Sequence, residues 1–111
     1  MRNNDFIANF FANTLPENDC CNHLLKQGNK LFNYSTEIVS IDRLNKKIEF
    51  NTHKYSRATS KIQSEIRRII NEHFPHYEVV EYDGGYCYYW NYGYMGAENW
   101  TKADLRKRGL L

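Results

Sequence analysis

The stretch SKIQSEIRRIINEHF, residues 60–74, decides the fold, because no other part of the chain predicts its structure so clearly. One apolar stripe follows helical spacing along it, and its members are Ile62, Ile66, Ile69, Ile70 and His73. Ser60 and Gln63 stand in the positions of a capping box, and Pro75 ends the helix. The sequence therefore predicts one long amphipathic helix from about Ser60 to Phe74.

Short strands are expected on both sides of this helix. Alternating apolar residues between turn residues place them at 31–34, 36–41, 47–51, 77–82 and 86–94. The turn residues at 42–46 would join the second and third strands in one hairpin. The turn at 83–85, with sequence Asp-Gly-Gly, would join the last two strands in another.

Two helices are predicted before the first strand. Asn4 caps the first, and its inward residues are Phe6, Ile7, Phe10 and Phe11. Residues 14–17, Thr-Leu-Pro-Glu, have the pattern of a capping box and open a second short helix that ends at Gly28. The residues that this second helix would carry inward are Cys20, Cys21, Leu24 and Leu25.

A capping box at Thr101–Asp104 predicts a last, short helix that ends near Gly109. These elements predict an α+β fold in which an antiparallel sheet of two hairpins packs on one long central helix, with short N- and C-terminal helices. The length of 111 residues fits one small domain, residues 1–111.

Composition excludes several classes of protein. The chain is 41% apolar and 25% charged, which is a globular balance, and no apolar run is long enough to span a membrane. No small-residue cleavage site follows the apolar residues 6–11, so the N-terminus makes a poor signal peptide. Three cysteines agree with a reducing compartment, where thiols stay free. We therefore expect a cytoplasmic protein with no membrane partner.

The tyrosines are concentrated in one segment, because six of the nine lie between Tyr82 and Tyr94. In a strand every second side chain points to the same face, which would here carry Tyr86, Tyr88, Trp90, Tyr92 and Tyr94. From Tyr77 to Asn99 the chain has four acidic residues and no lysine or arginine, which disfavours a phosphate backbone as the ligand. Some of these tyrosines are expected in the core, but at least two should be exposed. That composition is typical of a surface that binds a protein.

The predicted partner-binding residues are Tyr82, Asp83, Tyr86, Tyr88, Trp90, Tyr92, Tyr94 and Glu98. The alternative surface is basic and would bind nucleic acid through the central helix, and its residues are Lys54, Arg57, Lys61, Arg67 and Arg68. On that helix, Glu65 and Glu72 alternate with the basic residues, which favours an ordinary solvated face.

Neither a metal site nor a catalytic site is predicted. Adjacent Cys20 and Cys21 do not have the spacing of structural zinc ligands, even with His23 close by, so buried free thiols are expected. A Cys87 nucleophile activated by His53 or His73 would need a proximity that sequence does not test. His73 is expected to be a partly buried residue near the helix C-terminus. We expect no cofactor and no enzymatic activity.

Two spaced motifs lie between residues 28 and 63: GNKLFNYST at 28–36 and NTHKYSRATSKIQ at 51–63. The first contains Leu-aromatic-x-Tyr-x-Thr and the second Asn-x-x-Lys-Tyr-Ser-x-x-Thr-Ser-x-x-Gln. Together they resemble a pattern in a family of small, uncharacterised bacteriophage proteins, with Ala58 where that pattern has Thr. The resemblance implies a phage or another mobile element as the source, and it implies no catalytic or binding residue.

The residues of the second motif have a structural interpretation of their own. Ser56, Thr59 and Ser60 would satisfy the free amides of the first helical turn, and Tyr55 would pack over the helix start. The alternative is a ligand site lined by these hydroxyl groups.

The leading functional hypothesis is a non-catalytic phage protein that inhibits or redirects a host defence protein, such as a CRISPR effector. Aromatic side chains beside carboxylates suit an arginine-rich surface that normally binds nucleic acid, and covering that surface would inhibit by occlusion. The alternative is a nucleic-acid-binding accessory protein that uses the basic helix face and stacks bases on tyrosines. A third hypothesis is a small enzyme centred on Cys87 and the histidines.

Overall fold

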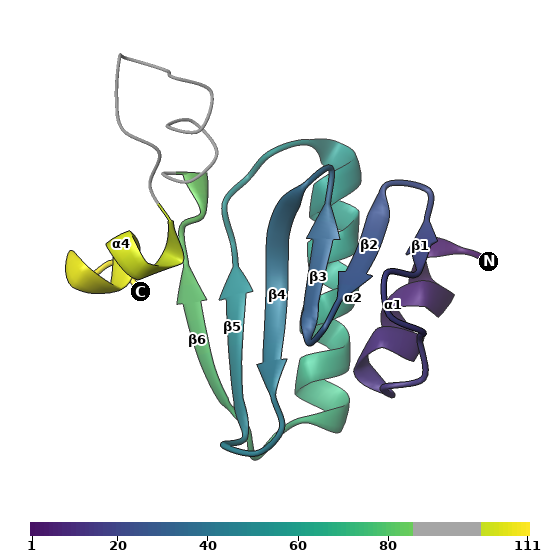
Figure 1. The fold of residues 1–111 in the computed structure, drawn as a ribbon, viewed down its shortest axis with the longest axis horizontal. Coiled ribbons are helices and arrows are strands. Elements are labelled where there is room, and N and C mark those ends of the chain that lie inside the picture. Colours follow the sequence, from purple (N-terminus) through teal and green to yellow (C-terminus); the bar gives the residue numbers. More distant parts are fainter. Residues whose placement is uncertain (86–100) are drawn as a thin grey trace.

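The computed structural model describes residues 1–85 and 101–111, which form a mixed six-stranded sheet and three helices (Figure 1). The helices are α1 (Asn3–Phe11), α2 (Arg57–His73) and α4 (Lys102–Lys107). The strands are β1 (Cys20–Cys21), β2 (Leu24–Gln27), β3 (Lys30–Asn33), β4 (Thr36–Asp42), β5 (Lys47–Asn51) and β6 (Glu78–Tyr82). The chain therefore has the expected α+β fold. None of the described helices is both long enough and apolar enough to cross a membrane.

The strands lie in the sheet in chain order, from β1 to β6. Neighbours from β1 to β5 are antiparallel, and the predicted hairpin between β4 and β5 is confirmed. β6, however, pairs with β5 in parallel, so the prediction of a purely antiparallel sheet is wrong. The physical reason is α2, which connects β5 to β6 and carries the chain back along the sheet before β6 begins. The predicted hairpin partner of β6, residues 86–94, lies outside the described residues.

The core lies between one face of the sheet and the helices α1 and α2 (Figure 1). The four isoleucines of the predicted α2 stripe are buried, with Ile66 fully inaccessible, and they share one core cluster with sheet residues such as Val39 and Phe50. The apolar residues of α1 are also buried, as predicted: Phe6, Ile7, Phe10 and Phe11. His73 was expected to be partly buried but is exposed, because it is the last residue of α2.

The predicted second helix is wrong, because Cys20 and Cys21 form β1 and residues 24–27 form β2. Asn18, Asn22 and Gly28 all have positive φ, and these left-handed residues bend the chain into turns that a helix does not allow. The side chains of Thr14 and Glu17, which were expected to form a capping box, make other hydrogen bonds. The Thr14 hydroxyl donates to the carbonyl of Asn9, and a Glu17 oxygen accepts from the Gly28 amide at 2.7 Å.

The helix caps differ in part from the prediction. α2 begins earlier than expected, and its N-cap is Ser56, whose hydroxyl oxygen accepts from the Thr59 amide. α1 begins after Arg2, which makes no side-chain cap, so the predicted cap at Asn4 is wrong. At α4 the predicted capping box of Thr101 and Asp104 is confirmed.

A β-bulge in β4 determines which side chains face away from the core. The pairing with β3 shifts between Leu31 and Phe32, and the extra residue in β4 is Ile38. Ile38 and Val39 are consequently both fully buried. Beyond the bulge, Glu37 pairs with Phe32 and joins the polar face opposite α2.

Candidate functional site

The predicted partner-binding residues lie at the boundary of the described structure. Only Tyr82 and Asp83 are described, and the remaining ones, from Tyr86 to Glu98, lie outside the described residues. Tyr82 is only 4% exposed, and the Lys102 ammonium lies 5.5 Å from its ring centre. Tyr82 is therefore one of the tyrosines that pack in the interior. Asp83 keeps 60% of its side chain exposed.

The chain enters residues 86–100, which we call the aromatic segment, from a fixed polar junction. Asp83 contacts the imidazole Nδ1 of His53 at 2.7 Å, and the Gly84 amide donates to Asn51 Oδ1 at 2.9 Å. A Cβ on Gly84 would lie 2.1 Å from Asn51 Nδ2, and one on Gly85 would lie 2.5 Å from the His53 ring. Only glycine lets the backbone at these two positions lie so close to the side chains of Asn51 and His53. The sequence pattern had indicated only a turn here.

Asn51 organises this junction. Its side chain is buried, and its amide nitrogen donates to the Glu37 carbonyl and to the Tyr55 hydroxyl. Its oxygen accepts from the backbone amides of His53 and Gly84. A fully satisfied buried amide of this kind holds its partners in one arrangement.

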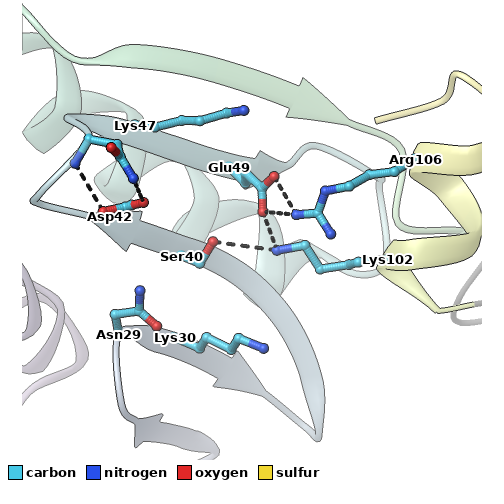
Figure 2. Close-up of a pocket in the computed structure, with 9 residues that line it drawn as sticks. Asn29, Lys30, Ser40, Asp42, Lys47, Glu49, Lys102 and Arg106 are labelled. Atoms are coloured by element: carbon cyan, nitrogen blue, oxygen red, sulfur yellow. Dashed lines mark hydrogen bonds and ion pairs between the residues drawn. The ribbon is translucent and has the colours of Figure 1, made fainter.

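The chain leaves the aromatic segment into α4, which ion pairs hold against the polar face of the sheet (Figure 2). The Lys102 ammonium lies 2.7 Å from a Glu49 oxygen and also contacts Glu37. Arg106 donates to both oxygens of Glu49 through one nitrogen, at 2.6 and 2.7 Å. Leu105 adds one fully buried apolar side chain. We call these contacts the α4 clamp.

The clamp keeps Glu49 ionised. Burial disfavours its charge, but hydrogen bonds from Lys102 and Arg106 outweigh burial and hold the pKa of Glu49 below its ordinary value. The Glu49 side chain is 13% exposed, so solvent screens these contacts less than at an open surface.

The residues of the two spaced motifs connect α2 to the sheet. The Thr59 hydroxyl donates to Asn33 Oδ1 at 2.7 Å, so the helix start is tied to β3. Gln63 donates to the carbonyls of Asn51 and His53, so it ties α2 to the end of β5 and does not act as a cap. The structural interpretation of the motif is confirmed for Ser56, which caps the helix. A cavity of about 390 Å³ adjoins these hydroxyl groups, with Tyr34 and Tyr55 in its lining.

The basic residues proposed for nucleic acid divide into two groups. Lys54, Arg57 and Lys61 are exposed near the start of α2 and make no ion pair among the described residues. Arg67, in contrast, pairs with Glu81 at 2.7 Å. Arg68 pairs with two carboxylates of its own helix, Glu65 at 2.6 Å and Glu72 at 2.7 Å. The hydrogen bonds that Arg68 donates to Glu65 are the main cause that raises the pKa of Arg68. Carboxylates therefore neutralise the positive charge of Arg67 and Arg68.

The cysteines and histidines that the structure describes do not gather around a common point. Cys20 was expected to be buried but is exposed, and the Cys21 thiol donates to the Met1 carbonyl at 3.0 Å. His23 stacks on Tyr34 with ring centres 4.1 Å apart. Within residues 1–85 and 101–111, no group of three potential ligands could hold a metal ion. Cys87 lies outside those ranges, so the Cys-His pairing stays untested.

Sequence reasoning missed the His53–Asp83 contact, because α2 and β6 separate the two residues in the chain. It also missed the α4 clamp, for which the charges of Lys102 and Arg106 were the only signal. In comparisons with known proteins, no family model, no curated protein and no solved structure matches this chain. The resemblance to phage proteins therefore stays a prediction.

Proposed function

We propose that this chain is a small non-catalytic protein, encoded by a phage or another mobile element, that binds a host defence protein in the cytoplasm and inhibits it. One observation carries the proposal: the folded body holds the aromatic segment at both of its ends. The junction of Asn51, His53 and Asp83 holds the first end, and the α4 clamp holds the second.

Fixed ends favour binding because part of the conformational entropy of the segment is lost on folding rather than on association. Binding residues are commonly presented on loops that a rigid scaffold positions. Tyrosine and tryptophan then contribute large contact areas with few rotatable bonds. The aromatic segment contains five tyrosines and two tryptophans: Tyr86, Tyr88, Tyr89, Trp90, Tyr92, Tyr94 and Trp100.

A described residue beside the segment adds negative charge. Asp83 lies at the first end of the segment and keeps 60% of its side chain exposed, whereas Glu81 on β6 is paired with Arg67. Aromatic rings next to carboxylates suit guanidinium groups, which stack on rings and form ion pairs. The expected target is accordingly an arginine-rich surface that binds nucleic acid, as in a CRISPR effector, and inhibition follows from covering it.

The test starts with capture of partners by the tagged full chain from lysate of the bacterial host. The captured protein is purified, and its affinity is measured for the wild type, for Tyr88→Ala/Trp90→Ala and for Tyr34→Ala. Tyr34 is a matched control, because it is a 58% exposed aromatic residue at another site. We expect about a hundredfold weaker binding for the double variant and no change for the control. The target's nucleic acid should compete with the wild type.

Circular dichroism must first show that the double variant is folded. A folded double variant that binds as tightly as the wild type would remove the aromatic segment from the proposal. Capture of the target without competition by nucleic acid would remove the occlusion mechanism and leave binding itself intact.

The alternative function is nucleic-acid binding, which is favoured by Lys54, Arg57 and Lys61, three cations that make no ion pair with any residue the structure describes. Fluorescence anisotropy with short oligonucleotides distinguishes it, since phosphate contacts weaken steeply as salt rises from about 50 to 200 mM. Salt-sensitive binding that Arg57→Glu/Lys61→Glu abolishes would make this the leading function.

A further inference from the structure

The face of the sheet opposite α2 contains a polar cavity of about 600 Å³ (Figure 2). Strands β3, β4 and β5 form its floor, and α4 closes one side. The charged side chains of its lining are Lys30, Lys47, Lys102, Arg106, Asp42 and Glu49. Glu37 lies beside it and binds Lys30 and Lys102.

The carboxylates of this face already have partners. Glu49 is bound by the α4 clamp, and Glu37 by two ammonium groups. Asp42 accepts from the backbone amide of Asn45 at 3.1 Å and from its side-chain amide at 2.7 Å. These hydrogen bonds are the main causes that hold the pKa of Asp42 below its ordinary value, and the charge of Lys47 adds a smaller contribution.

The cations, in contrast, retain binding capacity. Lys47 is half-buried on β5, and within the described part of the chain its ammonium has no carboxylate oxygen within 4.0 Å. Lys30 is 49% exposed and its one ion pair among the described residues is the 3.6 Å contact with Glu37. Arg106 binds Glu49 through a single nitrogen, which leaves the other donors of its guanidinium group for a ligand. A lysine on the cavity floor with no carboxylate oxygen this close among the described residues favours a bound anion.

We propose that this cavity binds a small oxyanion with two or more negative charges, such as a phosphorylated or polycarboxylate metabolite. Lys47 and Lys30 neutralise the ligand from the floor, and the outer donors of Arg106 hold it from the side of α4. Ser40 lies between them, and its hydroxyl provides a further donor. Because Arg106 belongs to the α4 clamp, a bound anion also stabilises the position of α4.

Isothermal titration calorimetry of the full chain tests the site with two probes, inorganic pyrophosphate and citrate, at constant low ionic strength. We expect saturable 1:1 binding, weakened about tenfold or more by Lys47→Met. Tighter binding of pyrophosphate would identify phosphate as the preferred group, and tighter binding of citrate would identify carboxylate. The control is Lys61→Met, which removes an exposed lysine of α2 outside the cavity and should not change the affinity.

Two further variants cover the case in which Lys47→Met does not fold. Lys47→Arg keeps the charge and should keep binding, and Lys30→Met removes an exposed charge and should weaken it. The absence of saturable binding for both probes would overturn the proposal. Equal affinities for the Lys47, Lys30 and Lys61 variants would overturn it too, since the anions would then bind elsewhere. Neither result bears on the aromatic segment, because no partner protein is present.

Discussion

The helices α2 and α4 contact opposite faces of the same sheet, and different forces hold them. α2 buries Ile62, Ile66, Ile69 and Ile70 against the core. α4 buries one apolar side chain, Leu105, and is otherwise held by ion pairs with Glu37 and Glu49.

The comparison predicts two levels of stability within one small protein. The contact of α2 is hydrophobic, so it is insensitive to pH and salt and should unfold only with the whole sheet. The contact of α4 depends on charges, so acid or salt should release it first. Since α4 holds one end of the aromatic segment, partner binding should weaken when the clamp is released.

The largest effect is expected from Ile66→Ala in α2. Ile66 is fully buried, and its truncation leaves a cavity in the core, so we expect a loss of about 3 kcal/mol in the free energy of unfolding. Urea denaturation measures the loss. Leu44→Ala is the control, because Leu44 is 91% exposed and should change the stability little. If both variants lost the same small amount, α2 would not be the main hydrophobic contact.

A smaller loss is expected from Gly84→Ala at the junction. The new methyl group would meet the Asn51 amide, and the resulting strain should cost about 2 kcal/mol. Asn51→Ala alone should also destabilise, because it leaves buried hydrogen-bonding groups without partners. The double variant has no clash, so its loss should be smaller than the sum of the single losses. Simple additivity in urea denaturation would show that the two residues do not touch.

The smallest effect is the pH response of the α4 clamp. The pKa of Glu49 is lower in the folded protein, so its stabilisation is fully present above the ordinary pKa of 4.5 and is lost as the pH falls through the lower folded value. The stability difference between the wild type and Glu49→Gln should therefore be largest near neutral pH and disappear in acid. Hydrogen exchange at the Leu105 amide, which donates to Thr101, reports on α4 directly.

Asp5→Asn on α1 provides the control for that measurement, because α1 lies at the other end of the sheet from α4 (Figure 1). It should leave Leu105 exchange unchanged at every pH. Faster exchange in Glu49→Gln at acid pH only, or an equal rate at all pH values, would contradict the role of the clamp.

The candidate site was predictable only in part. The composition of residues 82–98 indicated a binding segment, but Tyr82 is buried, with the Lys102 ammonium of α4 5.5 Å from its ring centre. Exposure of a tyrosine in a strand is decided by what packs over it, and composition carries no such information. The two spaced motifs were noted as patterns, and their role in joining α2 to β3 and β5 emerged only in three dimensions.

The sequence by itself determined the long helix, the β4–β5 hairpin, the first helix and the capping box of α4. Each depends on contacts within a few residues, so periodicity and turn chemistry are sufficient to predict it. Only the tertiary structure decided the strands at Cys20 and Leu24, the parallel pairing of β6 and the partners of Lys102 and Arg106. These features join residues that are far apart in the chain, and their free energy comes from burial and charge pairing that a local pattern does not encode.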